Sequence, residues 1–128
     1  MILADTDVLV DYLAGVEPVA SQVRACVDAD NLLTSAVTCF ELLSGAQDNK
    51  RGDATRRLVA ALRVVPLDRE AATKAAAIRR EQAGKGDSIP MADSLIAGIA
   101  IVNDLELLTR NRRHFESVSG LVLARFKV

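Results

Sequence analysis

The sequence predicts an α/β protein with a mostly parallel sheet. Short apolar runs alternate with longer helical stretches along the chain, the pattern of repeated strand–helix units. Half of the 128 residues are hydrophobic and only 3% are aromatic, so we expect an aliphatic core. No internal repeat, linker or low-complexity tract divides the sequence. We therefore expect a single domain over residues 1–128.

Apolar runs bounded by polar or turn residues predict five short strands: Ile2–Ala4, 31–34, 64–65, 107–109 and 121–124. Helical patterns with start signals predict the helices between them: 5–15, 19–27 after Pro18, Ala36–Gly45 after Ser35, a short helix to Leu62, 68–83 capped by Asp68, and 90–102 opened by Pro90. Residues 48–53 are expected to be a polar loop, and Gly84 is expected to end its helix in the left-handed conformation.

Charge is unevenly distributed although the net charge is only −1. Residues 1–49 carry eight acids and one base, whereas the remainder carries fifteen bases and nine acids. This asymmetry suits a site where carboxylates hold cations and nearby bases hold a polyanion, and it is equally compatible with ordinary surface scatter. The small net charge argues against a protein that coats nucleic acid by charge alone.

The two cysteines, Cys26 and Cys39, lack zinc-site spacing, so we expect two buried thiols in a reducing compartment. The start of the chain has no basic region followed by a cleavage pattern, and no apolar run is long enough to span a membrane. These features predict a cytoplasmic protein that does not enter the membrane.

Three carboxylates stand in segments where burial is expected. Asp5 ends the first apolar run and therefore lies at the carboxyl end of a predicted strand, where open parallel sheets bind ligands; a helix N-cap is an equally open interpretation. Glu41 has no base within four positions, and a solvated Glu is the alternative. Asp93 is the only ionisable residue between Met91 and Val102, a helix that is apolar all round.

A buried lone carboxylate costs several kcal/mol unless it is paired or binds a cation. The position of Asp93 in the first turn of its helix recovers about 1 kcal/mol at most, so a cation partner is expected, with a structural salt bridge as the alternative. Together, three oxygen donors from Asp5, Glu41 and Asp93 predict a hard-cation site for Mg²⁺ or Mn²⁺.

Four segments, in this order, resemble PIN-domain nucleases and specifically the VapC toxins of prokaryotic toxin–antitoxin pairs. They are the opening Ile-Leu-Ala-Asp-Thr-Asp-Val-Leu-Val (2–10), Ser-Ala-Val-Thr-Cys-Phe-Glu-Leu-Leu-Ser-Gly-Ala (35–46), Ile-Pro-Met-Ala-Asp-Ser-Leu-Ile-Ala (89–97) and Leu-Thr-Arg-Asn-Arg-Arg-His-Phe (108–115). They span nearly the whole chain.

The resemblance implies a PIN-like α/β fold with a central parallel sheet and an acidic pocket at its carboxyl end. It implies metal-dependent endonucleolytic cleavage of RNA, typically tRNA or ribosomal RNA, which inhibits translation. A VapB-like antitoxin is expected across the pocket, and a homodimer is expected. By motif position, Asp5, Glu41 and Asp93 take the three acidic roles.

Family members often have a fourth acid in the last motif, where this chain offers Asn111 and His114. This departure leaves open whether a second ion binds without the substrate phosphate. Asp7 is a candidate to compensate, although its place at a helix start can direct it elsewhere. His114 is open to two interpretations, a general base or a packing or surface residue.

We hypothesise that Asp5 and Asp93 bind the principal ion and that Glu41 takes a second position or orients the attacking water. Thr6 and Thr109 are candidates to hydrogen-bond carboxylates or a phosphate oxygen. Three bases are expected to hold the RNA backbone: Arg110, Arg112 and Arg113. The alternative is that these arginines are solvated surface residues.

Two other functions remain open from the sequence. The run Asp5-Thr6-Asp7-Val8-Leu9 also resembles the nucleophile motif of haloacid-dehalogenase-like phosphatases, in which Asp5 would be phosphorylated and Asp7 would act as acid and base. The chain is short for that fold, and the scheme gives Glu41 no role. The second alternative is a PIN-like scaffold that mainly binds a partner and cleaves little.

Overall fold

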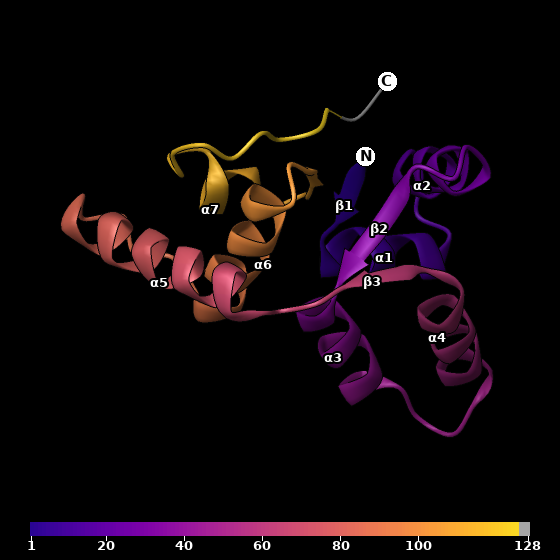
Figure 1. Cartoon of the computed structure of the whole chain (residues 1–128). Helices are drawn as coiled ribbons and strands as arrows, with labels where there is room; N and C mark the ends of the chain where they lie inside the picture. Colours follow the sequence, from indigo (N-terminus) through magenta and orange to yellow (C-terminus); the bar gives the residue numbers. More distant parts are fainter. Residues whose placement is uncertain (126–128) are drawn as a thin grey trace.

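The computed structural model describes residues 1–125, and within them four parallel strands form a central sheet in the order β3-β2-β1-β4 (Figure 1). The strands are β1 (Ile2–Ala4), β2 (Leu32–Ser35), β3 (Arg63–Val65) and β4 (Glu106–Leu108). Every pairing between them is parallel. The predicted α/β class with a mostly parallel sheet is therefore confirmed.

Seven helices in the described part of the chain surround the sheet: α1 (Thr6–Ala14), α2 (Val19–Asp28), α3 (Ala36–Gly45), α4 (Lys50–Ala61), α5 (Arg69–Gly84), α6 (Met91–Val102) and α7 (Arg112–Phe115). Three begin at side chains that cap them as expected. Asp5 accepts from the backbone N–H of Thr6, Ser35 from that of Thr38, and Asp68 from that of Ala71. Each bond satisfies one amide that the first turn leaves without a helical partner.

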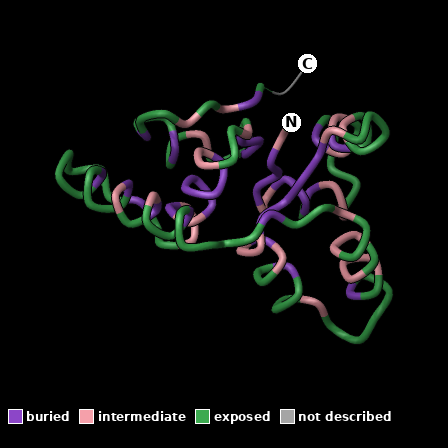
Figure 2. The backbone as a smooth tube through the Cα atoms, viewed as in Figure 1, coloured by how far each residue is buried: buried purple, intermediate pink, exposed green. Residues whose placement is uncertain are grey.

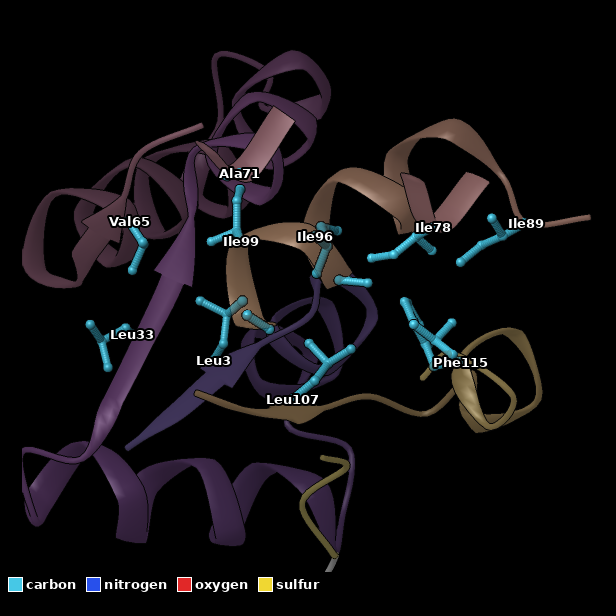
Figure 3. Close-up of a cluster of buried hydrophobic side chains, with 13 residues drawn as sticks. Leu3, Leu33, Val65, Ala71, Ile78, Ile89, Ile96, Ile99, Leu107 and Phe115 are labelled. Carbon is cyan, nitrogen blue, oxygen red and sulfur yellow. The ribbon is translucent and has the colours of Figure 1, made fainter. Parts of the chain in front are cut away.

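The two faces of the sheet bury different helices because side chains alternate along each strand. Leu3 pairs in register with Leu33 on one side and Leu107 on the other, and all three are buried on the face covered by α5 and α6. Figure 3 shows these leucines beneath Ile96 and Ile99 of α6, with the α7 side chain of Phe115 close to Ile78 and Ile89. Phe115 is 1% exposed and anchors α7 to this core.

The opposite face packs on α1 and α2. Its buried residues include Ala4 and Leu108 from the strands, Val8 and Leu9 from α1, and Val23 from α2. The pair α3 and α4 contributes fewer buried positions, and Figure 2 shows long exposed stretches there and along the segment joining them. The residues of the sheet and of α6 are thus largely buried, whereas most residues of α3 and α4 remain at least partly exposed.

Three details of the predicted secondary structure are wrong. Residues 121–124 run parallel to β4 but form only an isolated bridge, Leu107 with Leu123, instead of a strand. Leu107 alone supplies the backbone bonds between β4 and this segment. The pairing does not continue past Ala124, because the Ala124 carbonyl accepts from the Arg112 guanidinium instead of from a backbone amide of the neighbouring chain segment.

The expected loop 48–53 is shorter than predicted because α4 begins at Lys50. The Asn49 side chain caps it by accepting from the backbone N–H of Gly52 at 2.8 Å. Likewise, α5 continues through Gly84, and the left-handed residue is Gly86, with φ of 73°.

Neither cysteine is disulfide-bonded, and both side chains are half-buried, so the expectation of fully buried thiols is too strong. Within residues 1–125, no helix combines the length and the apolar character that crossing a membrane requires.

Candidate functional site

Asp5 lies at the carboxyl end of β1, the central strand between β2 and β4, and is 4% exposed. One carboxylate oxygen, Oδ1, accepts from the backbone N–H of Thr6 at 2.8 Å. The other, Oδ2, accepts from the hydroxyl of Thr109 at 2.7 Å, and Thr109 is itself fully buried just after β4. Asp5 is therefore both an N-cap and a buried carboxylate at the end of β1, so the N-cap does not exclude a role as a ligand.

The pKa of Asp5 is raised from 3.8 to about 6, and burial is the largest cause. The negative charges of Asp7 and Asp93 contribute to this rise, whereas the hydrogen bonds from Thr109 and Thr6 oppose it. Within residues 1–125, no Lys, Arg or His forms an ion pair with Asp5. A buried carboxylate among acids and without a basic partner is an environment that a cation would stabilise.

Asp93 is in the first turn of α6, and its side chain is 17% exposed. Its neighbours on the same helical stripe, Ile96, Ala97 and Ala100, are buried as expected. The partner of its carboxylate is His114 of α7, whose Nδ1 is 2.7 Å from Oδ2 of Asp93. The sequence leads us to expect a cation partner for Asp93, but it does not single out His114 for this place.

Glu41 is exposed, so the expectation of burial is wrong for this residue. It is nevertheless directed to the same end of the sheet, because Thr6 Oγ1 donates to Glu41 Oε1 at 2.6 Å. The hydroxyl of Thr6 also contacts that of the buried Thr38, at 3.0 Å. Thr6 thus links the residue after Asp5 to α3. A cavity of about 360 Å³ is lined by Thr6 and Glu41 and also by Lys50 and Arg51 of α4.

Asp7 accepts from the backbone N–H of Arg110 at 3.2 Å, and burial raises the pKa of its carboxyl. The guanidinium of Arg110 forms an ion pair with Asp11, which lies one helical turn beyond Asp7 and is buried. Sequence reasoning missed Asp11. The available signal was the spacing of Asp7 and Asp11, which places two acids on one face of α1 without a base nearby.

The three arginines predicted to hold RNA differ in how they are bound. Arg110 is tied to Asp11, and Arg112 donates to the Ala124 carbonyl at 2.8 Å. Arg113 is exposed, and within residues 1–125 it has no hydrogen-bond or ion-pair partner. Asn111 is exposed and precedes α7, and its backbone N–H donates to the Thr109 hydroxyl at 3.0 Å.

The donor chemistry of this site fits a hydrated Mg²⁺ or Mn²⁺ rather than an all-protein cage. Among the residues described, no three His, Cys, Asp or Glu side chains come close enough to form a ready-made metal site. Mg²⁺ usually keeps several waters and binds through one or two carboxylates together with substrate phosphates. Asp5 and Asp93, within electrostatic range of each other, supply that number of carboxylates. Glu41 is held near them through Thr6.

Comparison with known proteins places the chain in one family. The family model for the PIN domain matches residues 2–121. Ribonuclease VapC10 of Mycobacterium tuberculosis is 35% identical over 115 residues, covering 90% of this chain and 86% of that protein. The tRNA(fMet)-specific endonuclease VapC of Shigella flexneri is 29% identical, covering 93% and 92%.

A solved structure gives the same result for the fold. DNA-bound VapBC from Salmonella typhimurium contains a chain that superposes with a TM-score of 0.82 at 26% identity, covering 96% of each chain. The matches do not favour the phosphatase interpretation of Asp5 and Asp7, nor that of a PIN-like scaffold that mainly binds a partner and cleaves little. The chain belongs to the PIN-domain family and, within it, to the VapC-type ribonucleases.

Proposed function

We propose that this protein is a metal-dependent endoribonuclease that acts as the toxin of a toxin–antitoxin pair. The observation that carries the proposal is Asp5, a buried carboxylate at the carboxyl end of the central strand with two further acids near it and, within residues 1–125, no basic partner. Two relatives of the chain are proteins named ribonuclease and tRNA(fMet)-specific endonuclease. We therefore propose RNA, with tRNA or ribosomal RNA as the class, as the substrate.

In this proposal, Asp5 and Asp93 hold one Mg²⁺ or Mn²⁺, and Glu41 orients the attacking water or takes a second position. A bound divalent ion lowers the pKa of its water and neutralises phosphate charge. The chain's own residues do the rest. Thr109 and the Thr6 amide hold both oxygens of Asp5 in place, leaving a second lone pair on each oxygen for a further contact. Thr6 fixes Glu41 at the mouth of the cavity.

A VapB-like antitoxin is the proposed protein partner, because the neighbouring solved structure is a VapBC complex. We propose a homodimer, as the family resemblance implies, and a cytoplasmic location, which two cysteines that form no disulfide with each other fit. Among the predicted arginines, Arg113 is the proposed RNA contact, while Arg110 and Arg112 act mainly by holding Asp11 and the Ala124 carbonyl.

The test is an RNA cleavage assay with purified protein, Mg²⁺ or Mn²⁺, and a pool of transcribed tRNAs. Wild type is expected to cut, and EDTA is expected to stop it. Asp5→Asn and Asp93→Asn are each expected to lower the rate more than about 100-fold, since losing an indirect support of a metal ligand alone typically costs 10–100-fold. Asp28→Asn, an exposed acid at the end of α2, is the matched control and should cut like wild type.

A phosphomonoester is assayed beside the RNA. Turnover of that substrate without RNA cleavage would overturn the nuclease proposal, and RNA cleavage that survives Asp93→Asn would overturn the site. Sequencing of the RNA ends produced in induced cells then identifies the substrate. Growth arrest that the product of the adjacent small gene relieves is the result expected for a toxin.

A further inference from the structure

His114 is the only histidine of the chain, and the structure gives it a specific partner. Its Nδ1 is 2.7 Å from Oδ2 of Asp93, although the two residues are 21 positions apart in sequence. A carboxylate accepts, so His114 carries its proton on Nδ1 in this contact. The ring is half-exposed while Asp93 is 17% exposed. His114 therefore bonds the one acid of α6 from the solvent side.

The position of His114 is fixed by the fold rather than by the contact alone. The next residue, Phe115, is 1% exposed and packs into the core against which α5 and α6 also lie (Figure 3). The backbone N–H of His114 donates to the Asn111 carbonyl at 3.0 Å. With its backbone anchored on both sides, the imidazole reaches Asp93 from a platform that does not depend on Asp93.

The contact has a consequence for the carboxylate of Asp93. Without a partner, a side chain at a helix start samples several rotamers, and its two oxygens exchange places. A hydrogen bond from a fixed donor to Oδ2 removes that freedom and keeps the other oxygen available. Carboxylates that bind metals are generally held in this way by a second residue, and such partners matter nearly as much as the ligands.

We propose that His114 is a positioning residue that holds Asp93 by its Oδ2 and thereby presents the other oxygen to the divalent ion. The inference rests on the proposed function, because it concerns the ion assigned there to Asp5 and Asp93. It gives His114 a role different from the general base or simple packing considered from the sequence. His114 acts through Asp93 and does not itself bind the ion or the RNA.

Three substitutions at this position separate a positioning role from a structural one. His114→Ala removes the donor. His114→Asn places its side-chain N–H where Nδ1 lies, and His114→Gln places it where Nε2 lies, so the two amides control for each other. The probe is Mn²⁺ alone, titrated into each protein without RNA at neutral pH and followed by calorimetry or by loss of the free-ion EPR signal. Thermal unfolding of the metal-free proteins checks the fold.

The proposal predicts that His114→Ala weakens Mn²⁺ binding by about 10-fold or more, with RNA cleavage at limiting Mn²⁺ falling in parallel. His114→Asn is expected to recover most of that loss and His114→Gln little of it. Equal Mn²⁺ affinity for wild type and His114→Ala, or equal behaviour of the Asn and Gln variants, overturns the positioning role while the nuclease stands. A wild type that binds no Mn²⁺ and cuts no RNA overturns the proposed function, and the positioning role with it.

Discussion

The two flanks of Asp5 differ in how firmly their side chains are held. The closed flank consists of Thr109, Asp93 and His114. Thr109 is fully buried, and Asp93 and His114 bond each other beside the core that α5 and α6 help to form. The open flank consists of Thr6, Glu41, Lys50 and Arg51 around a cavity of about 360 Å³. There, a single bond from Thr6 holds Glu41, and both bases are exposed.

The difference indicates that the fold fixes the side-chain positions of only part of the site before a ligand binds. On the closed flank, packing and hydrogen bonds position the acids before anything binds. On the open flank, the exposed Lys50 and Arg51 keep their side-chain freedom, so ordering them costs entropy that a bound ligand has to offset. Substitutions of the same kind on the two flanks are therefore expected to have unequal effects.

The largest expected effect concerns the charge of Asp5 in the metal-free protein. Its pKa is about 6 in the folded chain against an ordinary value of 3.8, so between these values the folded chain keeps a proton that the unfolded chain loses. The favourable contribution is fully present below pH 3.8 and is lost as the pH rises through about 6. The difference corresponds to about 3 kcal/mol.

Asp5→Asn has no such titration. The stability of wild type relative to Asp5→Asn is therefore expected to fall by about 3 kcal/mol between about pH 3 and pH 7, as measured by urea unfolding in EDTA. Parallel pH profiles for the two proteins would show that Asp5 is not desolvated as the structure has it. Adding Mn²⁺ at pH 7 is expected to stabilise wild type more than the variant, because the ion favours the charged carboxylate.

The second prediction compares two glycines in helices. A Cβ on Gly98 of α6 would meet the Ala71 carbonyl oxygen at 2.7 Å and the Ala75 nitrogen at 2.9 Å, both of them backbone atoms of α5. Gly98→Ala is expected to lower the free energy of unfolding by about 2–3 kcal/mol through overpacking. Gly45 of α3 has nothing within 4 Å, so Gly45→Ala is expected to be neutral or slightly stabilising. Equal unfolding midpoints for the two variants would remove the distinction between enclosed and open helices.

The third prediction applies one substitution to each flank. Thr109→Val leaves the buried Asp5 oxygen and the Asn111 amide without their partner, and it is expected to cost about 1–2 kcal/mol of stability. Thr6→Val removes the bond to the exposed Glu41 and the contact with the Thr38 hydroxyl, which keeps Ser35 as a partner. It is expected to cost less than about 1 kcal/mol. Chemical denaturation measures both. A larger loss for Thr6→Val than for Thr109→Val would reverse the ranking of the flanks.

The smallest expected effect concerns the arginines after β4. Arg113 has no partner within the part of the chain that the structure describes, so Arg113→Ala is expected to leave stability unchanged. It is expected to weaken RNA binding about threefold and to lower the slope of log affinity against log salt by about 0.7–0.9. Arg112→Ala is the comparison, because losing the bond to Ala124 is expected to cost about 1 kcal/mol of stability. Unchanged salt dependence in Arg113→Ala would contradict an RNA contact there.

The sequence predicts the closed part of the fold better than the open part. The helix that contains Asp93 is recognisable because its apolar residues leave one acid alone, and the cap at Ser35 is a local signal three residues long. Such features depend on neighbours in the chain, and a sequence displays those directly. The start of α4 at Lys50 depends instead on Asn49 and on the close approach of Gly52 to Gln47, which polar composition does not reveal.

The candidate site divides in the same way. The position of Asp5 follows from the apolar run before it, because strand ends are visible in a sequence. The pairing of His114 with Asp93 joins residues 21 positions apart through the docking of α7, and no periodicity encodes that distance. The small or apolar neighbours of Glu41 predict burial, yet its helix lies at the exposed side of the molecule, which only the packing of α3 on the sheet determines.

The segment after Gly120 has a further consequence. This segment pairs with the outer side of β4 at Leu107. The Leu107 amide donates to the Val122 carbonyl at 2.9 Å, and the Leu107 carbonyl accepts from the Ala124 amide at 2.8 Å. At the opposite border, β3 is only three residues long, begins with the exposed Arg63 and is followed by Pro66. Within residues 1–125, neither border offers a long row of unpaired amides to a sheet from another molecule. Residues 121–124 therefore occupy, at Leu107, the edge of β4 along which a strand from another molecule would otherwise pair.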